Sequence, residues 1–208
     1  NRGKSLVVSG TNDLQVQLLV NAINNLLGNY GSTIDLTLPM NLQQGDEAKM
    51  QMLVAEMNEG KIGGLLVYNN NPAYEYPLAD DFKKGLQKVN LKVSFAETLD
   101  ETAVLCDYVC TGHNYLESWD DAEPIAGYFS FTQPSIRPIF NTRQFQDSLL
   151  KWIGSEVDYS TYLELYWNTK MSQLGIDMIA FNQFWNQVKH DGVWQSEKVT
   201  ASQPVFIV

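Results

Sequence analysis

The chain has 208 residues, of which 44% are apolar and 12% aromatic, enough to pack the core of one α/β domain with an appendage. Twenty-four acidic and 14 basic residues give a formal net charge of -10, and the acidic residues are scattered along the chain. A field of that sign repels polyanions, which excludes nucleic acid and anionic membrane surfaces as expected partners.

Neither end of the chain carries a targeting signal. No run of about 18 apolar residues could span a bilayer, and no basic start followed by an apolar stretch marks a signal peptide. The chain begins at Asn1 without a methionine and stops in the apolar run Pro204–Val208, which predicts a strand. We therefore expect an internal fragment of a longer protein.

The first 110 residues alternate short β-rich runs with amphipathic helices, the pattern of βαβ units. Asp13 is placed to cap the first helix and Gly28 to end it, and a second helix ends at Gly60. A third helix is expected near 79–89. The strands are predicted at 6–8, 34–38, 64–68 and 91–95. These cycles predict an α/β fold, a Rossmann-like doubly wound and mostly parallel sheet with helices on both faces.

The second half of the chain has a different pattern. Residues 111–127 lose all periodicity and predict a long loop, which is followed by a strand at 128–132 and a helix carrying Phe145, Leu149 and Trp152. Beyond Gly154 two aromatic-rich helices follow, so we divide the chain into an α/β domain at 1–154 and a helical extension at 155–208 that ends in a strand. The aromatic faces either pack on the module's own sheet, the favoured reading, or anchor a partner protein.

Three stretches in fixed order carry a family signature. The first is Gly3–Gly10 followed by Asn21–Gly31, a strand and helix that end in Leu-Leu-Gly-Asn-Tyr-Gly. The second is Gly60–Pro72, Gly-Lys-Ile-Gly-Gly-Leu-Leu-Val-Tyr-Asn-Asn-Asn-Pro. The third runs from Thr98 to Ala103, then Asp107-Tyr108-Val109 and Tyr115-Leu116-Glu117. Together they resemble the nucleotide-fold domain of the molybdopterin oxidoreductase family over roughly residues 3–153.

That resemblance implies a site for a pterin dinucleotide. In the family, the loop after the second motif's strand approaches the cofactor, here Asn69, Asn70, Asn71 and Pro72, and the carboxyl end of a parallel strand is where such sheets bind ligands. An Asx-type turn explains the same four residues without a ligand. Asn70 stands where the family has a glycine.

The family's next cofactor-facing loop is altered. Where relatives carry a glycine-rich loop that ends in arginine, this chain reads Asp120-Asp121-Ala122-Glu123-Pro124-Ile125-Ala126-Gly127-Tyr128, and only Gly127 is retained. Tyr128 in place of arginine removes a cation that pairs with phosphate, and the new carboxylates repel a pyrophosphate. We therefore predict that the pterin-facing loops are degenerate and that this fragment holds no cofactor.

Glu117–Ala122 further resembles the quinol-oxidising alternative complex III of bacteria, in which a molybdopterin-type domain without molybdenum is joined to an iron-sulfur domain. The resemblance implies the periplasmic side of the cytoplasmic membrane, iron-sulfur clusters elsewhere in the parent, and other domains and subunits of a membrane-associated respiratory complex as partners. Cys106 and Cys110 are too few for an all-cysteine cluster and are interpreted as packing residues.

Other catalytic patterns are poorly supported. His113 and His190 are interpreted as ordinary loop and helix-end residues, and Ser118 with His113 lacks the G-x-S-x-G elbow of a hydrolase. No glycine-rich dinucleotide or Walker motif follows the first strand. Carboxylates 120, 121 and 123 lack the spacing of a calcium loop and favour a solvated acidic loop.

Three functions remain open. The first is a cofactorless structural or assembly module of a respiratory electron-transfer complex. The second is one wall of the cofactor cleft in an active molybdoenzyme, where molybdopterin guanine dinucleotide would bind. The third is a free-standing small-molecule binding protein.

Overall fold

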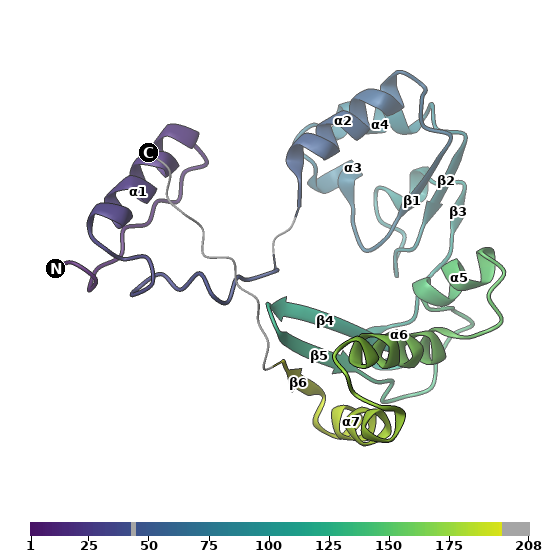
Figure 1. Ribbon diagram of the computed structural model, residues 1–208. Coiled ribbons are helices and arrows are strands. Elements are labelled where there is room, and N and C mark those ends of the chain that lie inside the picture. The colour runs from purple at the N-terminus through teal and green to yellow at the C-terminus, as the bar shows by residue number, and fades with distance from the viewer. Residues whose placement is uncertain (43–44, 197–208) are drawn as a thin grey trace. The chain divides into compact units, whose positions relative to one another are not determined.

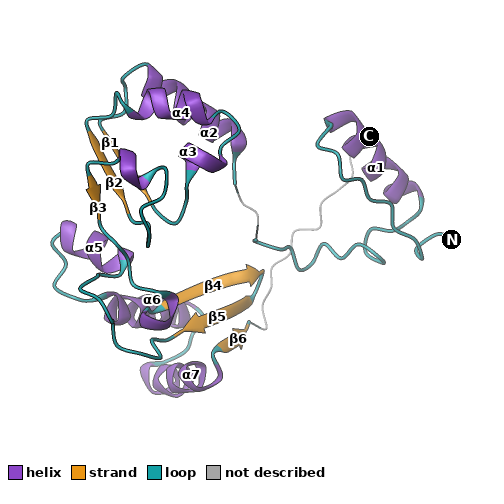
Figure 2. Ribbon diagram, turned by 180° about the vertical axis from the view of Figure 1, so that it is seen from behind, coloured by secondary structure: helices purple, strands orange, loops and turns teal. Residues whose placement is uncertain are grey.

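The computed structural model describes residues 1–42 and 45–196, which form two compact units (Figures 1 and 2). The first unit comprises the described parts of Asn1–Gln44, Ala122–Ser130 and Val193–Val208, and the second comprises Gly45–Asp121 and Phe131–Gly192. Each unit is built from stretches that are far apart in the sequence. The predicted strand at Pro204–Val208 lies outside the described residues, and the boundary expected after residue 154 stays a prediction.

The second unit contains the parallel sheet. Strands β1 (Gly64–Val67), β2 (Leu91–Ser94) and β3 (Tyr108–Val109) pair in the order β1-β2-β3, with Leu66 opposite Val93 and Val93 opposite Tyr108. β1 and β2 confirm the strands expected at 64–68 and 91–95 to within a residue. The α/β class is thereby confirmed, whereas the larger doubly wound sheet stays a prediction.

One face of this sheet carries the main core. Helices α2 (Glu47–Asn58), α3 (Pro72–Glu75) and α4 (Ala79–Leu86) supply most of it, and α2 and α4 lie side by side in both views (Figures 1 and 2). Met57, Phe82 and Leu86 are almost wholly buried. A Cβ atom on Gly85 would come within 2.9 Å of the Met57 Cβ, so the glycine permits the two helices to approach closely.

The C-terminal helices form an aromatic core of their own. α5 (Phe145–Trp152), α6 (Tyr159–Gln173) and α7 (Met178–Asp191) confirm the helices expected in this region. Trp167 and Trp185 are buried, and both rings contact Phe131 on strand β5 (Tyr128–Thr132), with centroids 4.9 and 6.0 Å apart. The aromatic residues at the centre of this cluster are therefore core, as favoured above.

The acidic stretch after Glu117 is not a loop. Asp120–Ile125 forms strand β4, and β4, β5 and β6 (Val193–Gln195) make a second three-stranded sheet in that order. The prediction of a continuous loop at 111–127 was wrong because backbone pairing with a neighbouring strand overrides the poor β propensity of Asp, Glu and Pro. The two-residue turn Ala126–Gly127 joins β4 to β5, with Gly127 at φ 78°.

The first unit contains helix α1 (Leu14–Leu26), and Asp13 caps it by accepting a 3.0 Å hydrogen bond from the Val16 amide. Gly28 follows the helix at φ 62°, as expected for a helix stop. The strands predicted at 6–8 and 34–38 were wrong for the described residues. Leu6 and Val8 are exposed, and the only ladder contact of the second stretch is an isolated bridge between Tyr30 and Ile34.

Candidate functional site

The first family stretch forms a buried asparagine cluster. Asn24 Oδ1 accepts hydrogen bonds from the Val7 amide (3.0 Å) and from Asn29 Nδ2 (2.8 Å), while Asn24 Nδ2 donates to the Val7 carbonyl (2.8 Å). Asn29 is fully buried, and its carbonyl accepts from the amides of residues 32, 33 and 34. This cluster holds the extended Leu6–Val8 stretch against the end of α1, so the motif is satisfied inside the fold.

The second stretch ends in the predicted ligand loop, at the carboxyl end of β1. Asn69 adopts a left-handed backbone conformation with φ 46°, and Asn70 follows it at the surface. Pro72 is buried at the first position of α3. Asn69 through Pro72 therefore lie where the sequence places them, at the sheet edge that binds ligands in α/β folds.

The side chain of Asn71 is engaged within the protein. Its Oδ1 accepts hydrogen bonds from the Thr102 amide (3.1 Å) and hydroxyl (2.7 Å), and its Nδ2 donates to Glu101 (2.7 Å). The Thr102 hydroxyl in turn accepts from the Ala73 amide at 3.0 Å, and Thr102 is 0% exposed. We call Asn71, Thr102 and Ala73 the Asn71 clasp. It joins the second stretch to the third and uses every polar group of Asn71.

The third stretch is also held internally. Asp100 Oδ1 accepts from the Thr102 and Ala103 amides at 3.0 and 2.7 Å. The buried Glu117 closes a capping box with Asn114 and accepts from the Ile139 amide at 3.0 Å. The Leu-Glu pair therefore anchors the chain that follows β5, a structural use that the residues satisfy without a ligand.

Little open space adjoins Asn69 itself. Tyr68 stacks on Phe145 of α5, with centroids 4.2 Å apart and planes within 13°, and Phe95 meets the same ring edge-on. The hollow lined by Tyr68, Asn69 and Trp119 measures about 30 Å³, the space of one water. Aromatic rings thus fill the place next to the first asparagine of the predicted loop.

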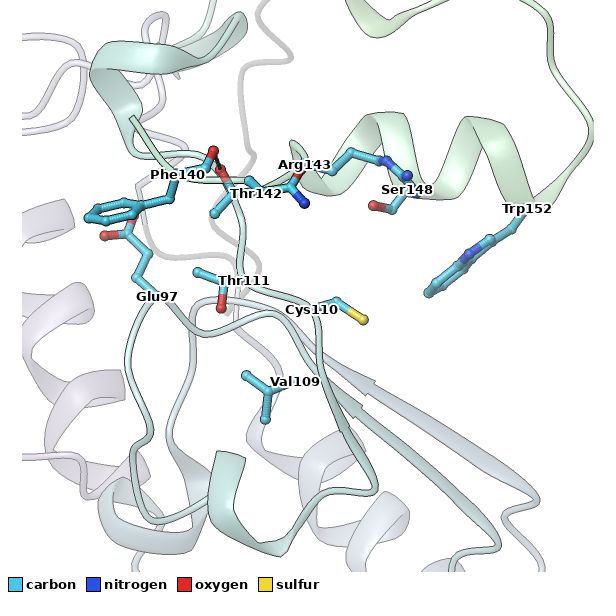
Figure 3. Close-up of a pocket in the computed structure, with 10 residues that line it drawn as sticks. Glu97, Val109, Cys110, Thr111, Phe140, Thr142, Arg143, Ser148 and Trp152 are labelled. Carbon is cyan, nitrogen blue, oxygen red and sulfur yellow. Dashed lines mark hydrogen bonds between the residues drawn. The ribbon is translucent and has the colours of Figure 1, made fainter. Parts of the chain in front are cut away.

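A larger hollow lies farther along the same sheet edge (Figure 3). It measures about 640 Å³, within the range of small-molecule sites. The stretch after β3 and the 140–143 loop line it together with α5, and Figure 3 shows Trp152 reaching toward it from α5. Its lining residues are Glu97, Val109, Cys110, Thr111, Phe140, Asn141, Thr142, Arg143, Ser148 and Trp152.

The sequence analysis missed Arg143 and Trp152 as lining residues. Their signal was local charge: residues 133–155 hold three cations against one carboxylate in a chain of net charge -10. Cys110 lines the hollow, whereas the Cys106 thiol contacts the Thr102 carbonyl at 3.4 Å. Burial raises the pKa of the Cys106 thiol, which keeps it protonated.

The carboxylates of the altered stretch have different partners. Asp121 Oδ2 accepts from the Trp167 indole at 2.9 Å, and Glu123 Oε1 accepts from the Gly127 amide at 2.8 Å. Partial burial raises the pKa of Asp120, and burial together with Asp121 and Asp120 raises that of Tyr159. Gly127 belongs to the first unit and the Asn69–Pro72 loop to the second. Their shared role in binding a cofactor stays a prediction.

The remaining candidates form no catalytic relay in the described part of the chain. The Ser118 hydroxyl donates to the Asn114 carbonyl at 3.0 Å, and no hydrogen bond to His113 is present there. His190 pairs with the neighbouring Asp191 at 2.7 Å on the surface. Among residues 1–42 and 45–196, no group of three His, Cys, Asp or Glu side chains could hold a metal ion, and no helix is long and apolar enough to cross a membrane.

Comparisons with known proteins agree with the three stretches. No family model matches the chain. A curated relative, the menaquinone reductase molybdopterin-binding-like subunit of Nitratidesulfovibrio vulgaris, is 39% identical over 90 residues, which are 41% of this chain and 13% of that protein. The chain therefore spans only a small part of its relative's length.

A solved structure shares the fold. Acetylene hydratase from Pelobacter acetylenicus matches with a TM-score of 0.53 and 17% identity, over 71% of this chain and 20% of that one. At this identity the match concerns the fold alone. The sequence match, the shared fold and the three ordered motifs together identify the chain as part of a molybdopterin oxidoreductase-family protein.

Proposed function

We propose that this part of the chain is a structural and assembly module of a quinone-linked respiratory electron-transfer complex and holds no pterin cofactor itself. The observation that carries the proposal is the Asn71 clasp: the retained family loop spends the polar groups of Asn71 on Thr102 and Glu101. The ring stack of Tyr68 and Phe145 fills the adjoining space. A loop committed in this way positions the chain and has no free Asn71 amide for a ligand.

The altered 120–128 stretch supports the same proposal. Asp121 and Glu123 stand where the family has a glycine-rich loop, and both carboxylates accept hydrogen bonds from this chain. Tyr128, in place of the family's arginine, accepts a 2.7 Å hydrogen bond from Gln195. The stretch therefore offers a phosphate no cation, and a pyrophosphate would meet like charge.

The relative's name supports the respiratory setting. That protein is a subunit of a menaquinone reductase. By the same resemblance we propose that the parent of this chain works on the periplasmic side of the cytoplasmic membrane, with iron-sulfur clusters elsewhere in the parent and other subunits as partners. Alternative complex III is the setting that the Glu117–Ala122 stretch resembles, and it belongs to this proposal.

One observation favours the second function, a wall of a working cofactor cleft. The 640 Å³ hollow lies at the carboxyl edge of the parallel sheet and contains a cation, Arg143, and an exposed indole, Trp152. In that case molybdopterin guanine dinucleotide would contact the hollow, and substitutions at Arg143 would lower the cofactor content of the intact protein.

Elemental analysis distinguishes the two functions. The intact parent subunit is purified from its own cells grown with added molybdate, and bound molybdenum is measured per polypeptide after gel filtration. The proposed function predicts only background molybdenum. A stoichiometric content would refute it and support the cofactor cleft.

A further inference from the structure

Residues 133–155 form a basic stretch in an acidic chain. Arg137, Arg143 and Lys151 stand against the single carboxylate of Asp147. All three cations are exposed, and none forms an ion pair within residues 1–42 and 45–196. Asp147 is itself engaged, because its Oδ1 accepts from the Tyr159 amide at 2.6 Å. The stretch therefore presents positive charge that this part of the chain does not neutralise.

Large apolar side chains are exposed in the same stretch. Phe140 is 75% exposed, Ile153 79% and Trp152 53%. Phe140 and Trp152 line the 640 Å³ hollow together with Arg143, and in Figure 3 the two aromatic side chains stand at opposite sides of it. Clustered aromatic and arginine side chains around a hollow are the composition of an interface hot spot.

A second hollow adjoins the first through Arg143. It measures about 370 Å³, and Arg143, Lys151 and Val157 are among its lining residues. The guanidinium of Arg143 thus belongs to both hollows. A partner that fills one hollow with an apolar side chain would meet a cation at its rim.

The surface is anchored to the core of its unit. Phe145 stacks on Tyr68, and the Trp152 ring lies 5.8 Å from that of Phe95. The Ile139 amide donates to the buried Glu117 carboxylate at 3.0 Å. Because its supports are buried, little side-chain ordering has to accompany binding.

We propose that these side chains, which we call the basic-apolar surface (Ile139, Phe140, Arg143, Lys151, Trp152 and Ile153), dock an acidic amphipathic segment of another subunit. An apolar side chain of that segment enters the hollow between Phe140 and Trp152, and a neighbouring carboxylate pairs with Arg143. This inference rests on the proposed function, since an assembly module requires a surface for its partner.

The charge pattern favours a protein segment over other partners. A net charge of -10 opposes a polyanion or an anionic membrane at long range, whereas one or two carboxylates at contact need only the local cations. The aromatic walls supply the apolar contact that a folded or folding segment can fill.

Site-specific photocrosslinking in the intact complex tests the docking. A benzoyl-phenylalanine replaces Phe140 in the parent subunit, the complex is purified through a tag on that subunit, and crosslinked peptides are sequenced by mass spectrometry. The same amino acid at Tyr74, an exposed aromatic position on α3, is the matched control. We expect the Phe140 position to crosslink to a peptide of another subunit with an Asp or Glu beside an apolar residue, and Tyr74 not to reach it.

Charge variants supply the second arm. Arg143→Glu should lower the yield of that crosslink about tenfold, because a like charge then faces the partner's carboxylate, while Arg143→Lys should keep most of it. Lys49→Glu makes the same change of net charge on α2 and should have little effect. Circular dichroism checks that each variant is folded. An unchanged yield in folded Arg143→Glu overturns the proposal, as do crosslinks only to lipid, to a second copy of this chain, or to no other subunit.

Molybdenum measured in the same preparation separates this inference from the proposed function. Stoichiometric metal with the expected crosslink refutes the cofactorless role and leaves the docking surface standing. Background metal without the crosslink refutes the docking surface alone.

Discussion

The Asn69–Pro72 loop and the Asp120–Tyr128 stretch differ in how they depart from their family. The first keeps the family residues, yet Asn71 holds Thr102 and Glu101. The second has lost the family residues, and its carboxylates accept from Trp167 and the Gly127 amide. The polar groups named in both stretches are satisfied by this chain. The comparison teaches that a retained motif and a replaced one can serve the same structural purpose.

The largest effect is expected at the clasp of the retained loop. Thr102→Val removes the hydroxyl that accepts from the Ala73 amide and donates to Asn71, in a fully buried place. The free energy of unfolding should fall by about 1–3 kcal/mol, because buried polar groups lose their partner. Urea unfolding followed by fluorescence measures it. Thr102→Ser keeps the hydroxyl and should lose less, and equal losses in the two variants would argue against the clasp.

A smaller effect is expected in the replaced stretch. Asp121→Ala removes the acceptor of the Trp167 indole hydrogen bond and should cost about 1 kcal/mol of unfolding free energy. Asp121→Asn keeps an acceptor oxygen and is the matched control. If the alanine variant is as stable as the asparagine variant, the carboxylate is not a structural group and the comparison breaks.

The two stretches should also respond to pH in opposite directions. The hydrogen bond from Asn71 lowers the pKa of Glu101, so its contribution to stability is present above the unfolded pKa and is lost as pH falls through the folded pKa. Partial burial raises the pKa of Asp120, so the benefit of its protonated form is lost as pH rises through the folded pKa.

Neutral variants test this difference. Unfolding free energies measured from about pH 3 to pH 7 should show that Glu101→Gln loses stability mainly at the neutral end, whereas Asp120→Asn gains there relative to the wild type. Both changes are expected to be small, because both groups are in contact with solvent. A pH dependence of the same sign at the two positions would contradict the assigned causes.

The smallest effect is expected at the residue that replaces the family's arginine. Tyr128→Phe removes the exposed hydrogen bond from Gln195 and should cost about 0.5 kcal/mol of unfolding free energy. The measurement is again urea unfolding. A loss as large as that of Thr102→Val would show that Tyr128 does more than its one described contact accounts for.

The helices were the most predictable part of the fold. Apolar spacing and caps located α1, α2 and α5, and Asp13 caps α1 as expected. Strands were harder, because a strand exists only where another pairs with it. Leu6–Val8 has strand composition without a ladder, whereas β4 has a ladder despite Asp120, Glu123 and Pro124.

The candidate site could be placed from the sequence, but its contacts could not. The motifs located the Asn69–Pro72 loop at the carboxyl end of β1. The partner of Asn71, Thr102, lies 31 residues away, and no local pattern links them. The hollow around Arg143 was missed for the same reason, since its walls come from β3, the 140–143 loop and α5.

The most direct test of the central claim is the pterin content of the intact parent subunit. Pterin is released by acid oxidation and measured by its fluorescence, beside a known molybdopterin enzyme prepared from the same cells as a positive control. A structural module predicts a signal far below one pterin per polypeptide while the control is fully loaded. One or more pterins per polypeptide would contradict it and would show that this fold still binds the cofactor.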